Sequence, residues 1–379
     1  MRICLVYDCL YPYTIGGAER WYDNLSRRLS ADGHTVTYLT LKQWEGDSPP
    51  RIPGVEVIAV GPRMLLYAGG RRRIVPPLIF GAGVFLHLLR AGRRYDVVHT
   101  ASFPYFSVLA AAAARLVHRY RLIVDWHEVW TDSYWREYLG PVGGRLGSAV
   151  QRLCLRVPQQ AFCFSRLHES RLRELRLNGI VTRLEGEYAG SLEAPDAVPA
   201  DPVVVFAGRH IPEKRVTALI PAFMRARAQI PALRLEVYGD GPDRAELIRL
   251  VARHGLGEVV EVPGFVPEER ISAALRRALC LVLPSKREGY GLIVVEAAAR
   301  GTPSVVVRDP DNAAAELIVE GVNGVVAPSA SADDLAAAIV RIHLKGHALR
   351  ESTVDWFRRN AERISLGHSL DVVTETYST

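Results

Sequence analysis

Two series of alternating apolar and helical segments constrain the fold of this 379-residue chain more than any other feature of its sequence. The apolar segments are short, consist mainly of Val, Ile, Leu and Cys, and are typical of strands buried on both faces of a sheet. Each is followed by a loop and a segment with helical periodicity. Parallel strands need such crossover connections, so the alternation predicts an α/β protein with doubly wound parallel sheets.

A break between the two series divides the chain. Residues 186–201 are rich in proline, alanine and acidic side chains, show no periodicity and predict an inter-domain linker. The length also favours two domains, because one hydrophobic core rarely serves so long a chain. We therefore predict a first domain over 1–185 and a second over 202–354, with a C-terminal helix over about 355–379 that crosses back onto the first.

The net charge of the chain limits the classes of molecule that it is expected to bind. Lys and Arg number 47 against 41 Asp and Glu, which gives 47 − 41 = +6 at neutral pH. This excess is too small to indicate a nucleic-acid-binding protein. It suits an anionic ligand or an acidic membrane surface, and it equally suits a charge that only aids solubility.

The cysteines indicate a reducing compartment. They form no CxxC pair, are odd in number and lie mostly in apolar runs: Cys4, Cys9, Cys154, Cys163 and Cys280. We expect reduced thiols in the core of a cytoplasmic protein. No signal peptide precedes the first predicted strand, and the longest apolar stretch is too short and too interrupted by prolines to span a bilayer.

The stretch Ser285–Pro303 contains the pattern with the most chemical meaning. It follows a predicted strand over 280–283, and its glycines indicate a turn that leads into a helix starting near Gly291. Free backbone N–H groups at that helix start bind anions. Glu288 then lies in the loop and Glu296 about one turn into the helix, an arrangement that suits a diphosphate flanked by hydroxyl-rich sugars. A capped helix with two surface glutamates explains the same spacing.

Two cations follow another predicted strand of the second series. Arg209 and Lys214 share one strand-to-helix loop, so both are expected to face the same edge of the sheet as Gly291. Together with helix N–H groups they would neutralise a diphosphate leaving group without a metal. Each cation alone is more often a solvated surface charge than a ligand contact. We discount Asp309-Pro310-Asp311 as a metal-binding DxD motif because it comes late in the second series.

The predicted first domain contains two candidate contacts with a ligand. Gly16 and Gly17 end the loop after the first predicted strand, where backbone either forms a simple turn or approaches a phosphate closely. His127 comes directly after a predicted strand, and ligands of parallel sheets bind beyond the carboxyl ends of strands. A lone histidine is otherwise often structural.

A basic and apolar stretch over 63–94 has two interpretations. The first is a core-facing helix with solvated arginines at both ends. The second is a membrane-surface patch in which Leu65, Leu66 and Phe85 enter the acyl region beside those arginines.

Taken together, six motifs resemble those of the GT-B glycosyltransferases, specifically glycosyltransferase family 4 (group 1). They occur in the family's order over nearly the whole chain. They are GGAE (16–19), DWHE (125–128), GRHIPEK (208–214), YGDGP (238–242), PGFV (263–266) and EGYGLIVVEAAARGTP (288–303). The resemblance implies two Rossmann-like domains facing a central cleft, and a retaining, metal-independent transfer from a nucleotide-diphospho-sugar without any cofactor.

The resemblance also implies roles for individual residues. The residues implied in catalysis are His127, Arg209, Lys214 and Glu288. Those implied in donor binding are Gly16, Gly17, Arg209, Lys214, Gly239, Val266, Glu268, Glu288, Gly289, Tyr290, Gly291, Leu292 and Glu296. Within this set, the two cations bind the diphosphate, Glu288 and His127 the sugar, Glu296 the ribose, and Glu268 the base.

Two departures leave the donor open between GDP-mannose, UDP-glucose and UDP-N-acetylglucosamine. Arg215 stands where many relatives have glycine, and DPDNAAAE (309–316) replaces a more glycine-rich turn. We expect a hexosyltransferase that acts on a cell-envelope, polysaccharide, lipid-linked or small-molecule acceptor, in the cytoplasm or peripherally on the inner membrane face. An inactive nucleotide-sugar-binding, membrane-docked scaffold is the alternative, and a GT-B epimerase or phosphorylase is a further rival.

Overall fold

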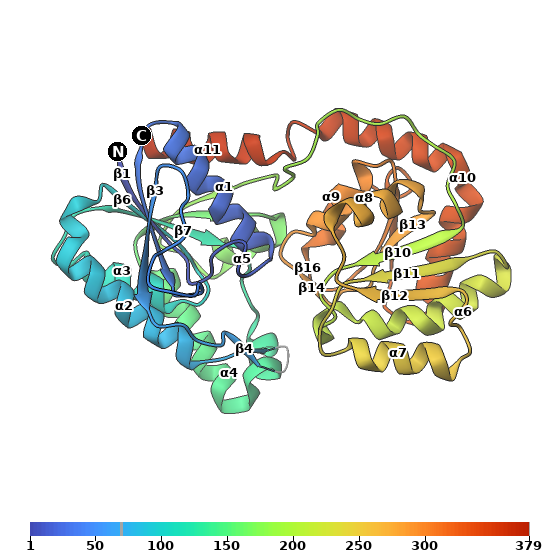
Figure 1. The fold of residues 1–379 in the computed structure, drawn as a ribbon, viewed down its shortest axis with the longest axis horizontal. Helices are drawn as coiled ribbons and strands as arrows, with labels where there is room; N and C mark the ends of the chain where they lie inside the picture. Colours follow the sequence, from blue (N-terminus) through green and yellow to red (C-terminus); the bar gives the residue numbers. More distant parts are fainter. Residues whose placement is uncertain (69–70, 379) are drawn as a thin grey trace. The chain divides into compact units, whose positions relative to one another are not determined.

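The computed structural model describes residues 1–68 and 71–378, which form two compact units. The first consists of Met1–Glu185 together with the chain from Ser369 onward, and the second of Gly186–His368. Each unit contains one large parallel sheet covered by helices (Figure 1). The prediction of two doubly wound α/β sheets is therefore confirmed.

The sheet of the first unit has seven strands in the order β3-β2-β1-β6-β7-β8-β9, all parallel. The strands are β1 (Arg2–Val6), β2 (Thr35–Leu41), β3 (Val55–Gly61), β6 (Val97–Ala101), β7 (Arg121–Trp126), β8 (Gln159–Cys163) and β9 (Gly179–Arg183). The side chains from Ile3 to Val6 of β1, an interior strand of this sheet, are fully buried. This explains why the sequence of β1 is a continuous apolar run.

The helices of the first unit connect these strands. They are α1 (Gly17–Ala31), α2 (Val75–Ala91), η1 (Gly92–Arg94), α3 (Phe106–Ala114), α4 (Asp132–Arg156) and α5 (Arg166–Glu174), and a short antiparallel pair, β4 (Tyr67–Ala68) and β5 (Arg71–Arg72), precedes α2. The last helix of the chain, α11 (Leu366–Ser378), places Tyr377 in this unit's core. The structure also corrects one expectation. The sequence predicts an aromatic loop over 130–138 beyond the strand that precedes His127, whereas the chain is helical from Asp132, and the hydroxyl of Thr131 caps this helix.

Helix α2 is the apolar part of the 63–94 stretch. Within the described chain, residues 75–94 form the one helical segment long and apolar enough to cross a bilayer by length and composition. In the structure this helix packs closely on β3. A side chain at Gly83 would place its Cβ 1.8 Å from the carbonyl oxygen of Val60. Helix α2 is therefore part of the packing of the first unit.

The sheet of the second unit has six strands in the order β12-β11-β10-β13-β15-β17, again parallel. The strands are β10 (Val203–Ala207), β11 (Arg234–Tyr238), β12 (Val260–Gly264), β13 (Cys280–Leu283), β15 (Ser304–Val307) and β17 (Gly324–Ala327). The covering helices are η2 (Pro212–Lys214), η3 (Val216–Ala218), α6 (Leu219–Gln229), α7 (Arg244–Arg253), α8 (Glu268–Arg277), α9 (Leu292–Ala298), η4 (Ala313–Leu317) and α10 (Ala332–Asn360).

All five cysteines are buried and free, as the sequence predicted. Burial in apolar surroundings raises the pKa of the Cys280 thiol to about 12, so the thiol is protonated at neutral pH. These thiols contribute to packing rather than to nucleophilic chemistry.

Candidate functional site

The candidate site of the second unit is built from three loops at one edge of its sheet. The loops are 208–215, 284–291 and 308–312, and they follow the adjacent parallel strands β10, β13 and β15. Backbone contacts join them. The amide of Lys286 donates to the carbonyl oxygen of Glu213 at 2.8 Å, which links the first two loops. Because adjacent parallel strands end at the same edge, the side chains of all three loops are brought together.

The contact between Lys214 and Glu288 lies at the centre of this arrangement. The Lys214 Nζ atom is 2.5 Å from Glu288 Oε1, and the two side chains are only 17% and 11% exposed. The hydroxyl of Ser285 donates to the same carboxylate oxygen at 2.7 Å. The two residues to which the sequence assigned separate roles, phosphate and sugar binding, are therefore direct partners. Such a pair fixes the position of the ammonium group and of the second carboxylate oxygen.

The sequence suggested that Glu288 lies in an irregular loop, but the structure places it on a strand. It lies on a two-residue strand, β14 (Arg287–Glu288), which pairs in parallel with β16 (Asp311–Asn312). The side-chain amide of Asn312 donates to the carbonyl oxygens of Ser285 and Val307 at 3.1 and 2.8 Å. The chain after β15 thus fixes the backbone that carries Glu288.

A second ion pair joins the two departures from the family motifs. Arg215 has a left-handed backbone (φ 49°, ψ 38°), and its Nη2 atom is 3.2 Å from Asp309 Oδ2. A left-handed conformation favours glycine, so an arginine there carries a backbone cost of about 1–2 kcal/mol. Asp309 is consequently engaged by a cation. Within residues 1–68 and 71–378, no three His, Cys, Asp or Glu side chains are grouped so as to hold a metal ion.

The helix after Gly291 begins where the sequence predicted. Gly291 precedes α9 with φ 101° and ψ 47°, and Leu292 is the first helical residue. A side chain at Gly291 would place its Cβ 2.5 Å from the Cβ of Ala314, so both the backbone and the packing require glycine. Glu296 lies half-buried within α9 and Tyr290 is buried, with Gly289 beside it.

The remaining candidates of the second unit lie farther along the same sheet edge. Arg209 is exposed in the loop after β10. Gly239 follows β11 with φ 117°, and a Cβ there would lie 1.9 Å from the carbonyl oxygen of Gly208, which gives this glycine a structural role. Val266 and Glu268 follow the edge strand β12. Val266 is buried, whereas Glu268 is exposed and begins α8.

His127 follows β7 in the first unit, beyond the carboxyl end of that strand. Its ring stacks on Phe164 with centroids 4.6 Å apart and an interplanar angle of 7°. Burial lowers the pKa of His127, and the opposing effect of the neighbouring Asp125 carboxylate is smaller. The imidazole is therefore neutral at pH 7 and able to act as a hydrogen-bond donor or acceptor.

The two glycines of the first unit lie at the start of α1. Gly16 is extended and precedes the helix, and Gly17 is its first residue. A Cβ at Gly16 would lie 2.4 Å from Glu19 Oε2, whose side chain is almost completely buried. The carboxylate of Glu19 occupies the space beside this turn, so a side chain at Gly16 would have to displace it.

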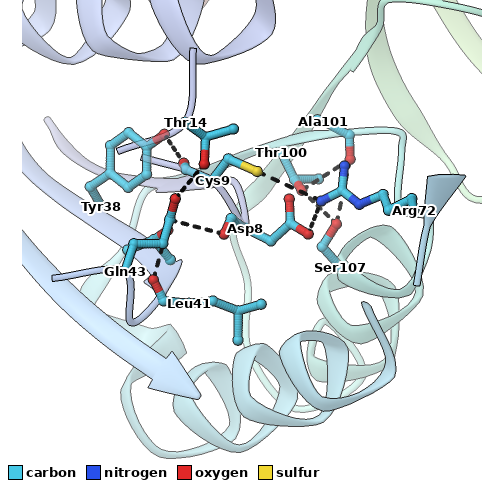
Figure 2. Close-up of polar contacts among 11 residues, drawn as sticks. Asp8, Cys9, Thr14, Tyr38, Leu41, Gln43, Arg72, Thr100, Ala101 and Ser107 are labelled. Carbon is cyan, nitrogen blue, oxygen red and sulfur yellow. Dashed lines mark hydrogen bonds and ion pairs between the residues drawn. The ribbon is translucent and has the colours of Figure 1, made fainter. Parts of the chain in front are cut away.

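The sequence missed a buried ion pair at the carboxyl end of β1. Asp8 is fully buried and pairs with Arg72 of β5, whose guanidinium also lies 5.2 Å from the ring centroid of Phe103. Figure 2 shows the guanidinium directed at the Asp8 carboxylate, next to the Cys9 sulfur. Burial lowers the pKa of Arg72, but the ionisable groups around it, Asp8 foremost, together outweigh this effect and raise the pKa well above its ordinary value.

This pair corrects the membrane interpretation in detail. Arg72 was included in the basic stretch as a solvated or lipid-facing charge, and Leu66 as a residue that enters the acyl region. Both are buried in the structure, whereas Leu65 is 74% exposed. The position of Asp8 directly after the first apolar strand was the one available signal, because a buried carboxylate there needs a cationic partner.

Comparisons with known proteins agree with the two-unit division. Residues 16–182 match the model of the glycosyl transferase 4-like domain, and residues 193–356 match the model of glycosyl transferases group 1. A glycogen synthase of Mycobacterium tuberculosis is 28% identical over 367 residues, which cover 89% of this chain and 85% of that protein. The chain spans only 18% to 40% of the length of several other curated relatives it matches.

Solved structures show the same fold. A sucrose-phosphate synthase from Thermosynechococcus elongatus superposes with a TM-score of 0.79 at 22% identity, over 100% of this chain and 98% of that one. The Anabaena protein HepE in complex with UDP-glucose superposes with a TM-score of 0.71 at 18% identity, over 100% and 99% of the two chains.

Proposed function

This chain belongs to the group 1 glycosyl transferases of glycosyltransferase family 4 and has the GT-B fold, and from that premise we propose that it transfers a hexose from a nucleotide-diphospho-sugar to an acceptor with retention of anomeric configuration. No metal or cofactor takes part in the proposed reaction. The observation that carries the proposal is the Lys214–Glu288 pair, held at the sheet edge where three loops meet.

The mechanism follows from how charge develops. Breaking the anomeric C–O bond leaves negative charge on the departing diphosphate and positive charge on the sugar. Lys214, fixed by Glu288, stabilises the diphosphate together with the exposed Arg209. Such a preorganised contact contributes on the order of 3–4 kcal/mol to the transition state. Because the cations supply this charge, the proposal needs no divalent ion.

The sugar and nucleotide contacts complete the proposed donor site. The second carboxylate oxygen of Glu288 accepts a sugar hydroxyl, and Glu296 accepts the ribose hydroxyls. His127, neutral because burial lowers its pKa, hydrogen-bonds the sugar near the reacting centre. Glu268, exposed at the start of α8, pairs with guanine N1 and N2. We therefore rank GDP-mannose first, followed by UDP-glucose and UDP-N-acetylglucosamine.

The proposed acceptor is a cell-envelope, polysaccharide, lipid-linked or small-molecule hydroxyl. Support for this range comes from the proteins that this chain resembles, which include a glycogen synthase and a sucrose-phosphate synthase. These two names already differ in acceptor size, so the acceptor class of this chain needs its own experiment.

A thermal-shift screen of nucleoside diphosphates and nucleotide sugars tests the donor assignment. A ligand that binds only the native protein at 100 times its Kd stabilises it by about 2.7 kcal/mol. We expect one base to raise the melting temperature of the native chain and not that of Lys214→Ala. Equal shifts in both proteins, or none in either, would contradict the role of Lys214. NMR of the anomeric proton then reads retention directly, with EDTA present to test metal independence.

The alternative is a nucleotide-sugar-binding scaffold without catalysis. It predicts the same thermal shift but neither transfer to an acceptor nor slow hydrolysis of the donor. The buried Lys214–Glu288 pair favours the enzyme, because a binding module does not need a carboxylate fixed beside its phosphate cation. Release of nucleoside diphosphate from the best-binding donor, with and without a mixture of sugar acceptors, distinguishes the two.

A membrane surface is the proposed second partner, with α2 as the contact. Leu78, Leu86 and Leu89 are 45%, 46% and 39% exposed on this helix, and the exposed Arg90 and Arg93 follow them. Leucines beside arginines suit an anionic lipid surface. We expect co-sedimentation with anionic vesicles at low salt, weakened at moderate salt and by Leu86→Glu. Absence of binding at low salt would remove this part of the proposal.

A further inference from the structure

Helix α4 folds back on itself and so forms a hollow in the first unit. Gly140, with φ 77° and ψ 177°, and Pro141 interrupt the helix and divide it into two limbs, 132–139 and 142–156. The limbs pack closely, because a Cβ at Gly144 would lie 2.5 Å from the Cα atom of Arg136 in the other limb. This contact fixes the spacing of side chains on the two limbs.

The hollow has a volume of about 590 Å³ and is lined by more cations than anions. Its four arginines are Arg136, Arg145, Arg152 and Arg156. The one carboxylate in the lining is Asp132, so the charged side chains sum to 4 − 1 = +3. A volume of this size is within the range of sites that bind small molecules.

Both oxygens of the Asp132 carboxylate have hydrogen-bond partners within the protein. Asp132 accepts hydrogen bonds from the hydroxyl of Ser148 at 2.5 Å and from Arg152 at 2.6 Å, which joins the two limbs. Arg145 and Arg156 are exposed, and no ion pair in the described chain involves either of them. Two guanidinium groups of the hollow therefore lack a counter-charge, and like charges gathered at one site favour the binding of an anion.

We propose that this hollow binds a phosphate or diphosphate group, held mainly by Arg145 and Arg156. Guanidinium groups bind phosphate oxygens through paired N–H donors, which is why arginine is the preferred cation for this anion. Leu153 adds an apolar side chain to the lining of the hollow and is 50% exposed. A phosphate carried by an amphiphile would place its hydrocarbon part there. The site shares no residue with the donor loops, so it stands independently of the proposed donor chemistry.

The test uses the full chain with Arg209→Ala and Lys214→Ala, so that the donor loops do not bind the probe. Inorganic pyrophosphate is titrated by calorimetry, and vesicles of phosphatidylcholine with and without phosphatidic acid are assayed by sedimentation. In this background, Arg145→Glu with Arg156→Glu is expected to weaken binding at least tenfold. The matched control is Arg51→Glu with Arg253→Glu, which reverses two exposed arginines outside the hollow.

The two probes identify the source of the phosphate. Pyrophosphate binding that depends on Arg145 and Arg156 supports a soluble phosphate ligand, and vesicle binding alone with the same dependence supports a lipid head group. Binding of neither probe, or an equal loss in the control pair, would overturn the proposal. Circular dichroism checks that each variant is folded, and Arg145→Gln with Arg156→Gln replaces the charge reversal if the glutamates disturb the helix.

Discussion

The Nδ1 atom of His99 lies 2.5 Å from the hydroxyl oxygen of Tyr377, although 278 residues separate the two in the chain. The other ring nitrogen of His99 lies 2.8 Å from the Asp125 carboxylate, which also accepts a hydrogen bond from the Trp21 indole at 2.8 Å. All four side chains are buried. A buried chain of hydrogen bonds therefore attaches the C-terminal helix α11 to the first sheet.

Tyr377→Phe is expected to destabilise the first unit while leaving its shape unchanged. The substitution removes one hydroxyl and leaves a buried nitrogen of His99 without its partner, which costs about 1–3 kcal/mol. The urea midpoint of unfolding measures this loss. Tyr13→Phe is the matched control, because Tyr13 is 48% exposed and its hydroxyl is solvated. An equal effect of both substitutions would contradict a special role for the His99 contact.

Lys214→Ala is expected to reduce kcat by about 100- to 1000-fold, in proportion to one lost electrostatic contact in the transition state. Lys214→Arg keeps the charge but not the geometry of the ammonium group beside Glu288, so partial activity is expected. Steady-state kinetics with the best-binding donor measure both variants. Lys345→Ala, at an exposed lysine of α10, is the control. Near-normal turnover in Lys214→Ala would remove the proposed leaving-group role.

The lowered pKa of His127 predicts how the stability of the protein changes at acid pH. Burial lowers this pKa below the ordinary 6.5, and Asp125 offsets only part of the effect. The unfolded chain then binds the proton more tightly, so this group's contribution to stability is complete above pH 6.5 and declines as the pH falls below it. We expect an NMR titration midpoint for His127 below 6.5, assigned with His127→Gln. A midpoint above that value would contradict a neutral imidazole at pH 7.

The central strands were predictable because burial on both faces leaves a direct mark on the sequence. Residues 203–207 and 280–283 are continuous apolar runs, and the structure has β10 and β13 at these bounds. The edge strand β9 (Gly179–Arg183) was missed for the opposite reason. It is exposed or half-exposed along its length, so no apolar run distinguishes it from a loop.

The pairings within the site were beyond prediction for a different physical reason. Lys214 and Glu288 are 74 residues apart and Asp8 and Arg72 are 64 apart, and no local pattern records such contacts. A motif in the sequence made Lys214 and Glu288 candidate site residues, yet it assigned them to different parts of the ligand. Periodicity reports which face of an element is buried, whereas the partner of a charge depends on the complete fold.

The left-handed backbone of Arg215 gives the last prediction. Arg215→Gly loses an ion pair whose arginine is 31% exposed, worth at most about 1 kcal/mol, but gains about 1–2 kcal/mol from relief at positive φ. Arg215→Ala loses the ion pair without that relief. The glycine variant is therefore expected to be more stable than the alanine variant by about 1 kcal/mol in urea unfolding. The same difference is expected when Asp309→Ala removes the partner, because the backbone cost does not depend on the ion pair. A glycine variant no more stable than the alanine variant would contradict the backbone cost proposed for this position.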